Sequence, residues 1–347
     1  MRRPLLTLLL SLTALAAAAQ PGDSLLTVAL CGDIMMGTTY PTVRLPENDG
    51  ADIFADVKQL VLDADLAAGN LEGVICDGGT CTKNTDKANN YAFRMPESYA
   101  HLLKEAGFDY LNLANNHTND FGTYGLERTR EILTEQGICY SGLPDCECVV
   151  IEKDGVRYGI CSFGHNSYTL KHTDTASVTR IVTELRPQCD ILVVSFHGGA
   201  EGSKYSHLPD GPESYLGENR GNLRDFAHHC IDLGADIVFG HGPHVTRAVE
   251  CYHDRLIAYS LGNFCTTFGV NLAGVNGYAP VLTVRIDRDG RFVDGRIHSF
   301  IQTQGTGPKL DPTDRVAQHM RSLSLSDFRG DCGLDISDNG TLTRKTR

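Results

Sequence analysis

Residues 234–245, GADIVFGHGPHV, join a short apolar run to two histidines, His241 and His244, with only Gly242 and Pro243 between them. The run has the apolar character of a buried strand. The chain therefore presents both imidazoles where a strand ends, and ligands of open α/β sheets gather at the carboxyl ends of strands. Two interpretations follow: the histidines bind a metal ion, or glycine and proline simply shape a turn there.

The same arrangement, an apolar strand followed by groups able to bind metal, occurs five times along the chain. The groups are Asp33 in CGDIMMG, Glu72 in AGNLEG, Asn116 with His117 in LANNHTND, His197 in VSFHGG, and His241 with His244. Each of them alone is ordinary, because Asn and Asp are common turn formers. Their recurrence favours one shared centre. Imidazoles, carboxylates and an amide carbonyl form a mixed nitrogen and oxygen set that suits Mn, Zn or Fe.

Short apolar strands alternate with amphipathic helices, which is the pattern of a layered α/β domain. Helices are expected at 96–107, 123–137, 177–187 and 222–234, and the first has proline in its first turn and glycine after its last. Strands at 279–287 and 291–300 flank a tight-turn signal, which predicts an antiparallel pair. Without a clear linker, we expect one domain over residues 27–301, followed by a C-terminal helix and tail over 302–347.

Composition excludes some partners. The 347 residues include 31 Lys and Arg against 43 Asp and Glu, a net charge of −12, and the only basic run is the short tail TRKTR. Wholesale binding to nucleic acid or to anionic lipid is therefore not expected.

The N-terminus has the features of a cleaved signal peptide over residues 1–20. Two arginines precede an apolar stretch that ends in an alanine-rich cleavage site near Ala19 or Gln20. The stretch is shorter than the roughly 20 residues of a spanning helix. We expect an extracytoplasmic protein, periplasmic or secreted, with no integral membrane segment after cleavage. Loss of Arg2 and Arg3 changes the net charge from −12 to −14.

The twelve cysteines are interpreted as structural. Several lie in apolar strand-like runs, where cysteine behaves as a small hydrophobic residue. CDGGTC, Cys76 to Cys81, has the spacing of a locally closed loop, and the sequence leaves open whether this pair forms a disulfide.

Six motifs taken together resemble those of the CapA family, the capsule or poly-γ-glutamate synthesis proteins of the calcineurin-like metallophosphoesterase superfamily. They are GDIMMG, GNLEG, NLANNHTNDFG, FHGGAEG, GADIVFGHGPHV and IAYSLGNF, in order from about Thr27 to about Ile301. The resemblance implies a four-layer α-β-β-α sandwich with a metal site along one sheet edge.

The resemblance also implies roles for individual residues. Asp33, Asn116, His197, His241 and His244 match metal ligands of the superfamily. His117 matches the histidine that stabilises or protonates the departing group, and we expect Asp120, three residues later, to orient it.

Three departures from the superfamily pattern alter the expected centre. Met35 replaces a histidine, Asn70 replaces the bridging aspartate, and two residues rather than one separate His241 from His244. Glu72 is the nearest carboxylate to the bridging position. Because a thioether is a poor ligand for hard divalent ions, we expect one ion held firmly and a second held loosely.

Two functions of different class follow. The first is an exported metal-dependent hydrolase that acts on an anionic polymer or on a small phosphorylated or γ-glutamyl substrate, in capsule or envelope polymer biosynthesis or as a periplasmic metallophosphoesterase. The second is a non-catalytic accessory of the capsule synthesis machinery that binds anionic polymer through its metal site. The polar loop at 203–221 is expected to form a lid or substrate rim. His207 and Arg220 in this loop either meet an anionic substrate or are solvated loop residues, and Glu201 before it either matches a family glutamate near the metal edge or is a surface carboxylate.

Overall fold

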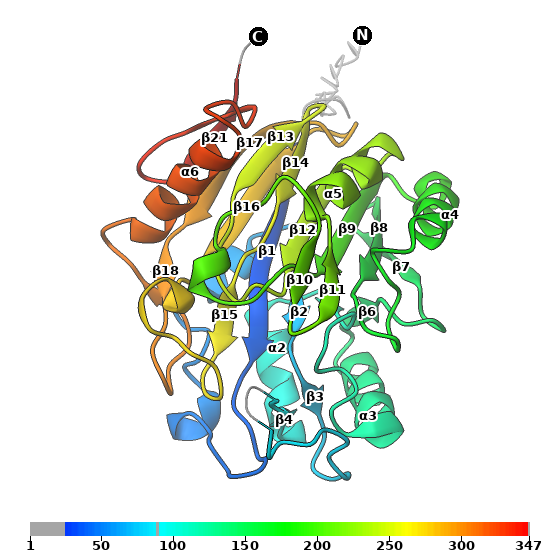
Figure 1. The fold of residues 1–347 in the computed structure, drawn as a ribbon, viewed down its shortest axis with the longest axis vertical. Helices are drawn as coiled ribbons and strands as arrows, with labels where there is room; N and C mark the ends of the chain where they lie inside the picture. The colour runs from blue at the N-terminus through cyan, green and yellow to red at the C-terminus, as the bar shows by residue number, and fades with distance from the viewer. Residues whose placement is uncertain (1–24, 88–89, 346–347) are drawn as a thin grey trace, which may run out of the picture.

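Two β-sheets pack face to face, and helices cover the outer face of each in the computed structural model (Figure 1). The structure describes residues 25–87 and 90–345, so the predicted signal peptide lies outside the described residues. The predicted four-layer α-β-β-α architecture is confirmed.

The larger sheet has nine strands in the order β20-β21-β17-β16-β1-β2-β5-β6, and β15 pairs with the end of β1. Their bounds are β1 Leu26–Met35, β2 Leu66–Leu71, β5 Tyr110–Asn112, β6 Cys139–Ser141, β15 Asn263–Thr266, β16 Val281–Ile286, β17 Phe292–His298, β20 Leu334–Ile336 and β21 Thr341–Arg344. β2 and β15 run parallel to β1, whereas β16 is antiparallel to it. The predicted antiparallel pair is β16 with β17.

The smaller sheet has six strands in the order β13-β14-β12-β9-β8-β7. Their bounds are β7 Cys148–Lys153, β8 Val156–Phe163, β9 Ile191–His197, β12 Ile237–His241, β13 Val249–Tyr252 and β14 Arg255–Ala258. Three further two-strand pairs are β3 Val74–Ile75 with β4 Arg94–Met95, β10 Glu213–Tyr215 with β11 Glu218–Gly221, and β18 Phe300–Ile301 with β19 Lys309–Leu310.

The predicted helices are present, and side chains cap the N-termini of two of them, α4 and α5. The α-helices are α1 Lys58–Leu62, α2 Ala100–Ala106, α3 Gly122–Glu135, α4 Thr175–Leu185, α5 Leu223–Asp232 and α6 Arg315–Asp327. The carboxylate of Asp174 and the amide of Asn222 accept hydrogen bonds from backbone N–H groups in the first turns of α4 and α5. Gly107 ends α2 at φ 99°, a left-handed conformation that favours glycine.

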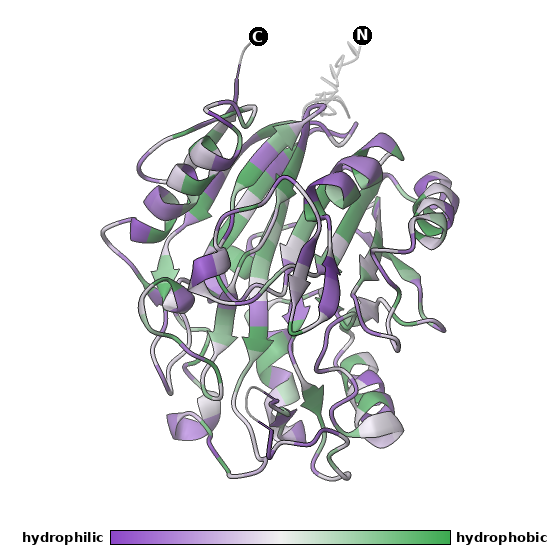
Figure 2. Cartoon of the chain, in the orientation of Figure 1, coloured by the Kyte–Doolittle hydropathy of each residue, from purple (hydrophilic) through white to green (hydrophobic). Residues whose placement is uncertain are grey.

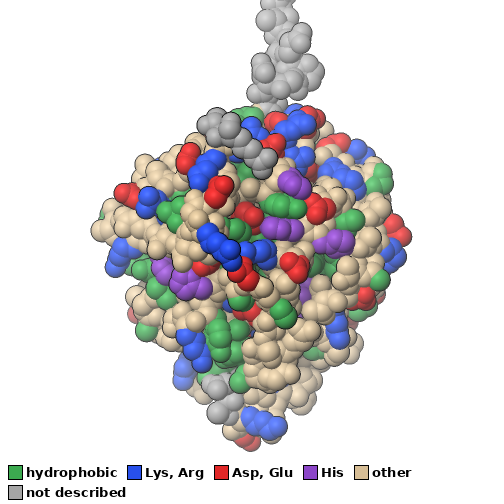
Figure 3. Space-filling model, turned by 45° about the horizontal axis from the view of Figure 1, so that its top comes forward, with side chains coloured by type: hydrophobic (Ala, Val, Ile, Leu, Met, Phe, Trp, Pro, Cys, Tyr) green, Lys and Arg blue, Asp and Glu red, His purple; other side chains and the backbone are tan. Residues whose placement is uncertain are grey.

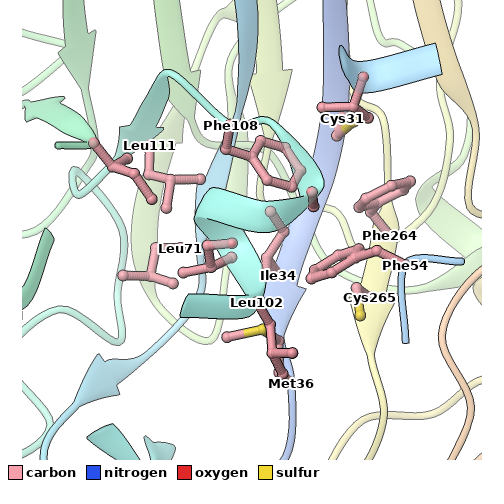
Figure 4. Close-up of a cluster of buried hydrophobic side chains, with 14 of the residues drawn as sticks. Cys31, Ile34, Met36, Phe54, Leu71, Leu102, Phe108, Leu111, Phe264 and Cys265 are labelled. Carbon is pink, nitrogen blue, oxygen red and sulfur yellow. The ribbon is translucent and has the colours of Figure 1, made fainter. Parts of the chain in front are cut away.

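Apolar side chains fill three buried layers, and the strands between the helices are correspondingly hydrophobic (Figure 2). One face of β1 contributes Val28 and Leu30 to the layer between the two sheets. Its other face contributes Ala29 and Cys31, and after a register irregularity at Asp33 also Ile34, to the layer beneath α1–α3 (Figure 4). α4 and α5 cover the smaller sheet. Alternation along β1 therefore binds the larger sheet to both of its neighbours.

The C-terminal segment belongs to the same sandwich. α6 inserts Val316, Ala317 and Met320 into the layer between the sheets and contributes Leu323 to the layer beneath α4 and α5. β20 and β21 then extend the larger sheet beyond β17. α6 thus closes one end of the sandwich.

The surface and the cysteines agree with the composition. On the face drawn in Figure 3, acidic and basic side chains lie interspersed. No helix within residues 25–87 and 90–345 is long and apolar enough to cross a membrane. The thiols of Cys76 and Cys81 are both free, so the candidate disulfide is not formed in this structure.

Replacing Met320 with alanine should lower the free energy of unfolding by about 2–5 kcal/mol, because it opens a cavity where α6 seals the two sheets. Urea unfolding followed by circular dichroism measures the change. Leu310→Ala, at a side chain that is 61 % exposed, is the control and should have little effect. Equal effects of the two substitutions would contradict a sealing role for α6.

Candidate metal centre and its pocket

Parallel strands of both sheets deliver the predicted side chains to one edge of the sandwich. In the larger sheet, Asp33 of β1 lies beside Asn70 of β2, and Glu72 follows β2 directly. In the smaller sheet, His197 at the end of β9 lies beside His241 at the end of β12. All five side chains are fully buried. Carboxyl ends of parallel strands thus meet at the site, as the sequence predicted.

Asp33 forms one half of the site with the two histidines of GHGPHV. His244 Nδ1 lies 2.9 Å from Asp33 Oδ2, and His241 Nδ1 lies 3.4 Å from Asp33 Oδ1. Burial acts to raise the pKa of Asp33, but the close imidazoles of His241 and His244 outweigh it and hold the pKa well below its usual range. Burial lowers the pKa of His244, yet the Asp33 carboxylate dominates and raises that pKa to about 10.

Glu72 forms the other half. Its Oε2 lies 3.3 Å from His197 Nε2, and its Oε1 lies 3.8 Å from His117 Nε2 and 4.0 Å from His244 Nε2. Burial acts to raise the pKa of Glu72, but the charge and close contact of the His197 imidazole prevail and lower it to about 2. Both carboxylates are therefore held ionised, each by imidazoles from the opposite sheet or from the loop after β5.

Asn70 joins the two halves from the position where the superfamily has its bridging aspartate. Its Nδ2 donates to Asp33 Oδ1 at 2.8 Å and to Glu72 Oε2 at 2.6 Å. Its Oδ1 accepts a hydrogen bond of 3.0 Å from the buried amide of Asn115. Asn70 and Asn115 thus fix the separation of the two carboxylates, a function that the sequence analysis did not assign to either residue.

His117 and Asp120 form the predicted pair. His117 Nδ1 lies 2.8 Å from Asp120 Oδ2, and the Asp120 carboxylate also accepts the backbone N–H of Phe93. Lys83 adds a contact that sequence reasoning missed: its Nζ lies 2.6 Å from Asp120 Oδ1 and 3.1 Å from His117 Nδ1. Lys83 follows no strand and stands in a polar loop, so no sequence signal distinguished it.

Several buried nitrogens test whether these residues fit a metal ion. Among the described residues, both ring nitrogens of His197 and of His241 lack a hydrogen-bond partner, and so does Glu72 Oε1. Buried polar atoms normally have partners, and imidazole with carboxylate is a donor set for divalent transition metals. The residues therefore fit a metal ion in chemistry.

The arrangement of these residues fits a metal ion less completely than their chemical type does. No three His, Cys, Asp or Glu side chains within the described ranges are grouped as a ready-made metal site. The donors are instead paired with one another as carboxylate–imidazole contacts. Met35, at the position of a superfamily histidine, is fully buried.

Asn116 differs from its neighbour Asn115. Its side chain is only partly buried, and its Oδ1 has no hydrogen-bond partner among the residues described. The hydroxyl of Tyr168 donates to its backbone carbonyl at 2.9 Å. Asn116 therefore lines the pocket while its Oδ1 is buried and without a partner in the described chain.

A pocket of about 650 Å³ opens above the centre, with Asn116, His117 and His244 among its lining residues. The loop at 203–221, which was expected to be a lid or rim, lines this pocket, in part through the β10–β11 hairpin that it contains. The buried Arg247 anchors that hairpin through two contacts of 2.7 Å with the Glu213 carboxylate.

The three loop candidates have different positions. Glu201 and Arg220 both line the pocket and pair with each other at 2.9 Å. Of the two alternatives for His207, substrate contact or a solvated loop position, the structure favours the second: its imidazole contacts Asp327 at 2.6 Å and is not among the pocket's lining residues.

Solved structures of low sequence identity share the fold. A novel phosphatase from Mycoplasma pneumoniae aligns with a TM-score of 0.52 and 12 % identity over 81 % of this chain and 95 % of that one. A hypothetical protein from Thermus thermophilus aligns with a TM-score of 0.50 and 16 % identity over 80 % of this chain and all of that one. The chain thus shares its two-sheet fold with a phosphatase.

Sequence relatives place the chain more narrowly. Residues 27–267 match the family described as bacterial capsule synthesis protein, PGA_cap, and the chain belongs to that family. It is 31 % identical over 260 residues to the PGA biosynthesis protein CapA of Bacillus subtilis, across 70 % of this chain and 63 % of that one. It is 30 % identical over 269 residues to the capsule biosynthesis protein CapA of Bacillus anthracis, across 69 % and 59 %. The match spans about three fifths of the length of these relatives.

Replacing Lys83 with methionine should destabilise the protein by roughly 2–4 kcal/mol, because it leaves the buried Asp120 carboxylate without its ammonium partner. Thermal and urea unfolding at neutral pH measure the loss. Lys87→Met, at an exposed lysine of the same loop, should be close to neutral. A stability equal to that of the control would show that the Lys83–Asp120 contact contributes nothing.

Proposed function

We propose that the chain is an exported component of capsule or envelope polymer biosynthesis whose sheet edge forms a metal-dependent hydrolytic centre. The observation that carries the proposal is the convergence of Asp33, Glu72, His197, His241 and His244, all linked by contacts of 4.0 Å or less, beneath a pocket. Family membership supports the biosynthetic role.

These five residues would hold one or two divalent ions of Mn, Zn or Fe, with Asn116 as a further oxygen donor. When bound, such an ion supplies Lewis acidity for a phosphoryl or acyl oxygen and activates water for attack. Glu72 takes the place of the bridging carboxylate because its longer side chain reaches toward His117, His197 and His244. Asn70 carries no charge and serves to orient Asp33 and Glu72.

His117 is the residue placed to protonate or stabilise a departing group, because it lines the pocket and its Nε2 faces the centre. Asp120 fixes its ring through Nδ1, and Lys83 compensates the Asp120 charge. This arrangement supports hydrolysis of a phosphoester or an amide bond, on a small phosphorylated or γ-glutamyl substrate or on a polymer.

A second candidate is an accessory that binds an anionic polymer without turnover, as part of the capsule synthesis machinery. Asn70 favours it, because an amide in the bridging position cannot neutralise two cations as an aspartate does. The absence of a ready-made three-residue metal group in the described chain also favours it.

Metal content per chain should be one or two ions in protein purified without chelator and loaded with Mn, Zn or Fe. The double variant His241→Ala/His244→Ala should lose them, because both imidazoles border Asp33. Plasma mass spectrometry after desalting measures the content, and His228→Ala/His229→Ala on α5 is the matched control. A parent protein that retains no metal would overturn the metal-dependent centre.

Hydrolysis should depend on the pair formed by His117 and Asp120. With Mn or Zn present, His117→Asn is expected to lower kcat for bis-p-nitrophenyl phosphate or γ-glutamyl-p-nitroanilide by about 100-fold or more, without loss of metal. His207→Asn, outside the pocket, should keep the parent rate. If the metal-loaded parent hydrolyses neither compound faster than the metal-free protein at several pH values, the accessory function is the correct one.

A further inference from the structure

The pocket above the centre has almost no unpaired positive charge. Arg220 is compensated by Glu201 and Glu218, each at 2.9 Å, and Lys83 is compensated by Asp120. Lys204 is the one lining cation for which the described residues offer no carboxylate within 4.0 Å, and its Nζ lies 5.0 Å from the ring of Tyr205. A chain with one carboxylate per residue would meet Glu201 and Glu218 there and find a single free ammonium.

Where the pocket lining has no cations, it is formed by aromatic and apolar side chains. Tyr91 lines the pocket with 55 % of its surface exposed, and its ring lies parallel to that of Phe93, with centroids 6.5 Å apart. Phe93 in turn contacts the His117 ring at 4.3 Å. A line of three rings therefore runs from the pocket to the centre, and its outermost face is open to a ligand.

Leu216 adds a second apolar feature at the turn of the β10–β11 hairpin. It is 67 % exposed, lines the pocket and has a φ of 49°, a left-handed conformation that is uncommon for leucine. Asn or Gly is the usual residue at such a turn position. An apolar side chain kept exposed at a strained position indicates a contact surface.

Side-chain amides supply the polar part of the lining. Asn90, Asn116, Asn166, Asn263, Asn271 and Asn276 all line the pocket. Asn263 is fully buried and donates to the carbonyls of His244 and Asn276, yet its Oδ1 has no partner among the residues described. Asn166 Oδ1 is likewise buried without a partner in the described chain. Free acceptors in a pocket require a ligand that donates hydrogen bonds.

We propose that the pocket binds an uncharged glycosyl unit of the substrate, with Tyr91 as the stacking platform and the Asn166 and Asn263 amides as acceptors for its hydroxyl groups. A sugar ring combines apolar C–H faces with several hydroxyl donors, which is the combination that this lining requires. A γ-glutamyl chain offers one N–H donor per residue but also one carboxylate, and that charge does not fit a lining whose cations are almost all paired. The inference rests on the proposed function, since the glycosyl unit is attached to the group on which the centre acts.

Binding of neutral trisaccharides to the whole protein tests this inference. The probes are cellotriose and N-acetylchitotriose, compared with tri-γ-glutamate, in saturation-transfer NMR and titration calorimetry. We expect at least one of the two neutral probes to receive saturation at its ring protons and to bind at least about tenfold more tightly than tri-γ-glutamate. Tyr91→Ala should weaken that binding about tenfold or more, and Asn166→Ala should weaken it as well. Tyr124→Ala, at a tyrosine of α3 that is 54 % exposed and does not line the pocket, should leave it unchanged.

Failure of the two neutral probes at millimolar concentration, or tighter binding of tri-γ-glutamate that Lys204→Ala weakens, would overturn the inference. Equal effects of Tyr91→Ala and Tyr124→Ala would also overturn it. The measurements are made on chelator-treated and on metal-loaded protein. Sugar binding without hydrolysis would remove only the hydrolytic function, whereas hydrolysis without sugar binding would remove only the glycosyl specificity.

Discussion

The side-chain nitrogen of Asn70 donates hydrogen bonds to two buried carboxylates, Asp33 and Glu72. The rest of the structure depends on balancing the negative charge of these two carboxylates. An ionised carboxylate removed from water is costly unless it is paired and hydrogen-bonded. The larger sheet supplies the carboxylates and the amide. The smaller sheet supplies His197 and His241, and the loop after β12 supplies His244. The two sheets must therefore pack together for the site to form, and the buried carboxylates are balanced only when they do.

The same group explains why this centre differs from a symmetric two-ion site. An aspartate at position 70 would add a third buried negative charge between Asp33 and Glu72, whereas the amide of Asn70 donates to both. The centre consequently resembles two adjacent carboxylate–imidazole groups held at a fixed separation. Substrate specificity then depends on the pocket above the centre. Its aromatic and amide lining and its paired charges both differ from those of a site that binds a polyanion.

Much of the fold was predictable because each motif marks the end of a buried strand. Alternating strands and helices indicated the layers, and the parallel direction of β1, β2, β9 and β12 brought distant motifs together. The spacing of His117 and Asp120 was also informative, since residues three apart in a tight turn are neighbours in space.

Other features of the site had no local signal in the sequence. Lys83 reaches Asp120 across a long loop, so only the folded chain places them together. Asn115 and Asn116 are adjacent and alike in sequence, and burial alone distinguishes the structural amide from the open one. The sequence left open whether Cys76 pairs with Cys81 and whether His207 contacts substrate; the folded chain shows two free thiols and an imidazole against Asp327.

The position of β1 has a consequence for how the protein is made. Leu26–Met35 is among the first segments of the described chain, yet one of its neighbours in the sheet is β16, Val281–Ile286. Pairing across such a separation is slow, and an unpaired edge is open to association with other chains until its partner arrives. A nascent chain that ends before β16 already holds every side chain of the proposed metal centre, from Asp33 to His244. It still lacks the strand that pairs with Leu26–Cys31, so the side chains of the proposed centre stand on an incomplete sheet until Val281–Ile286 has been synthesised.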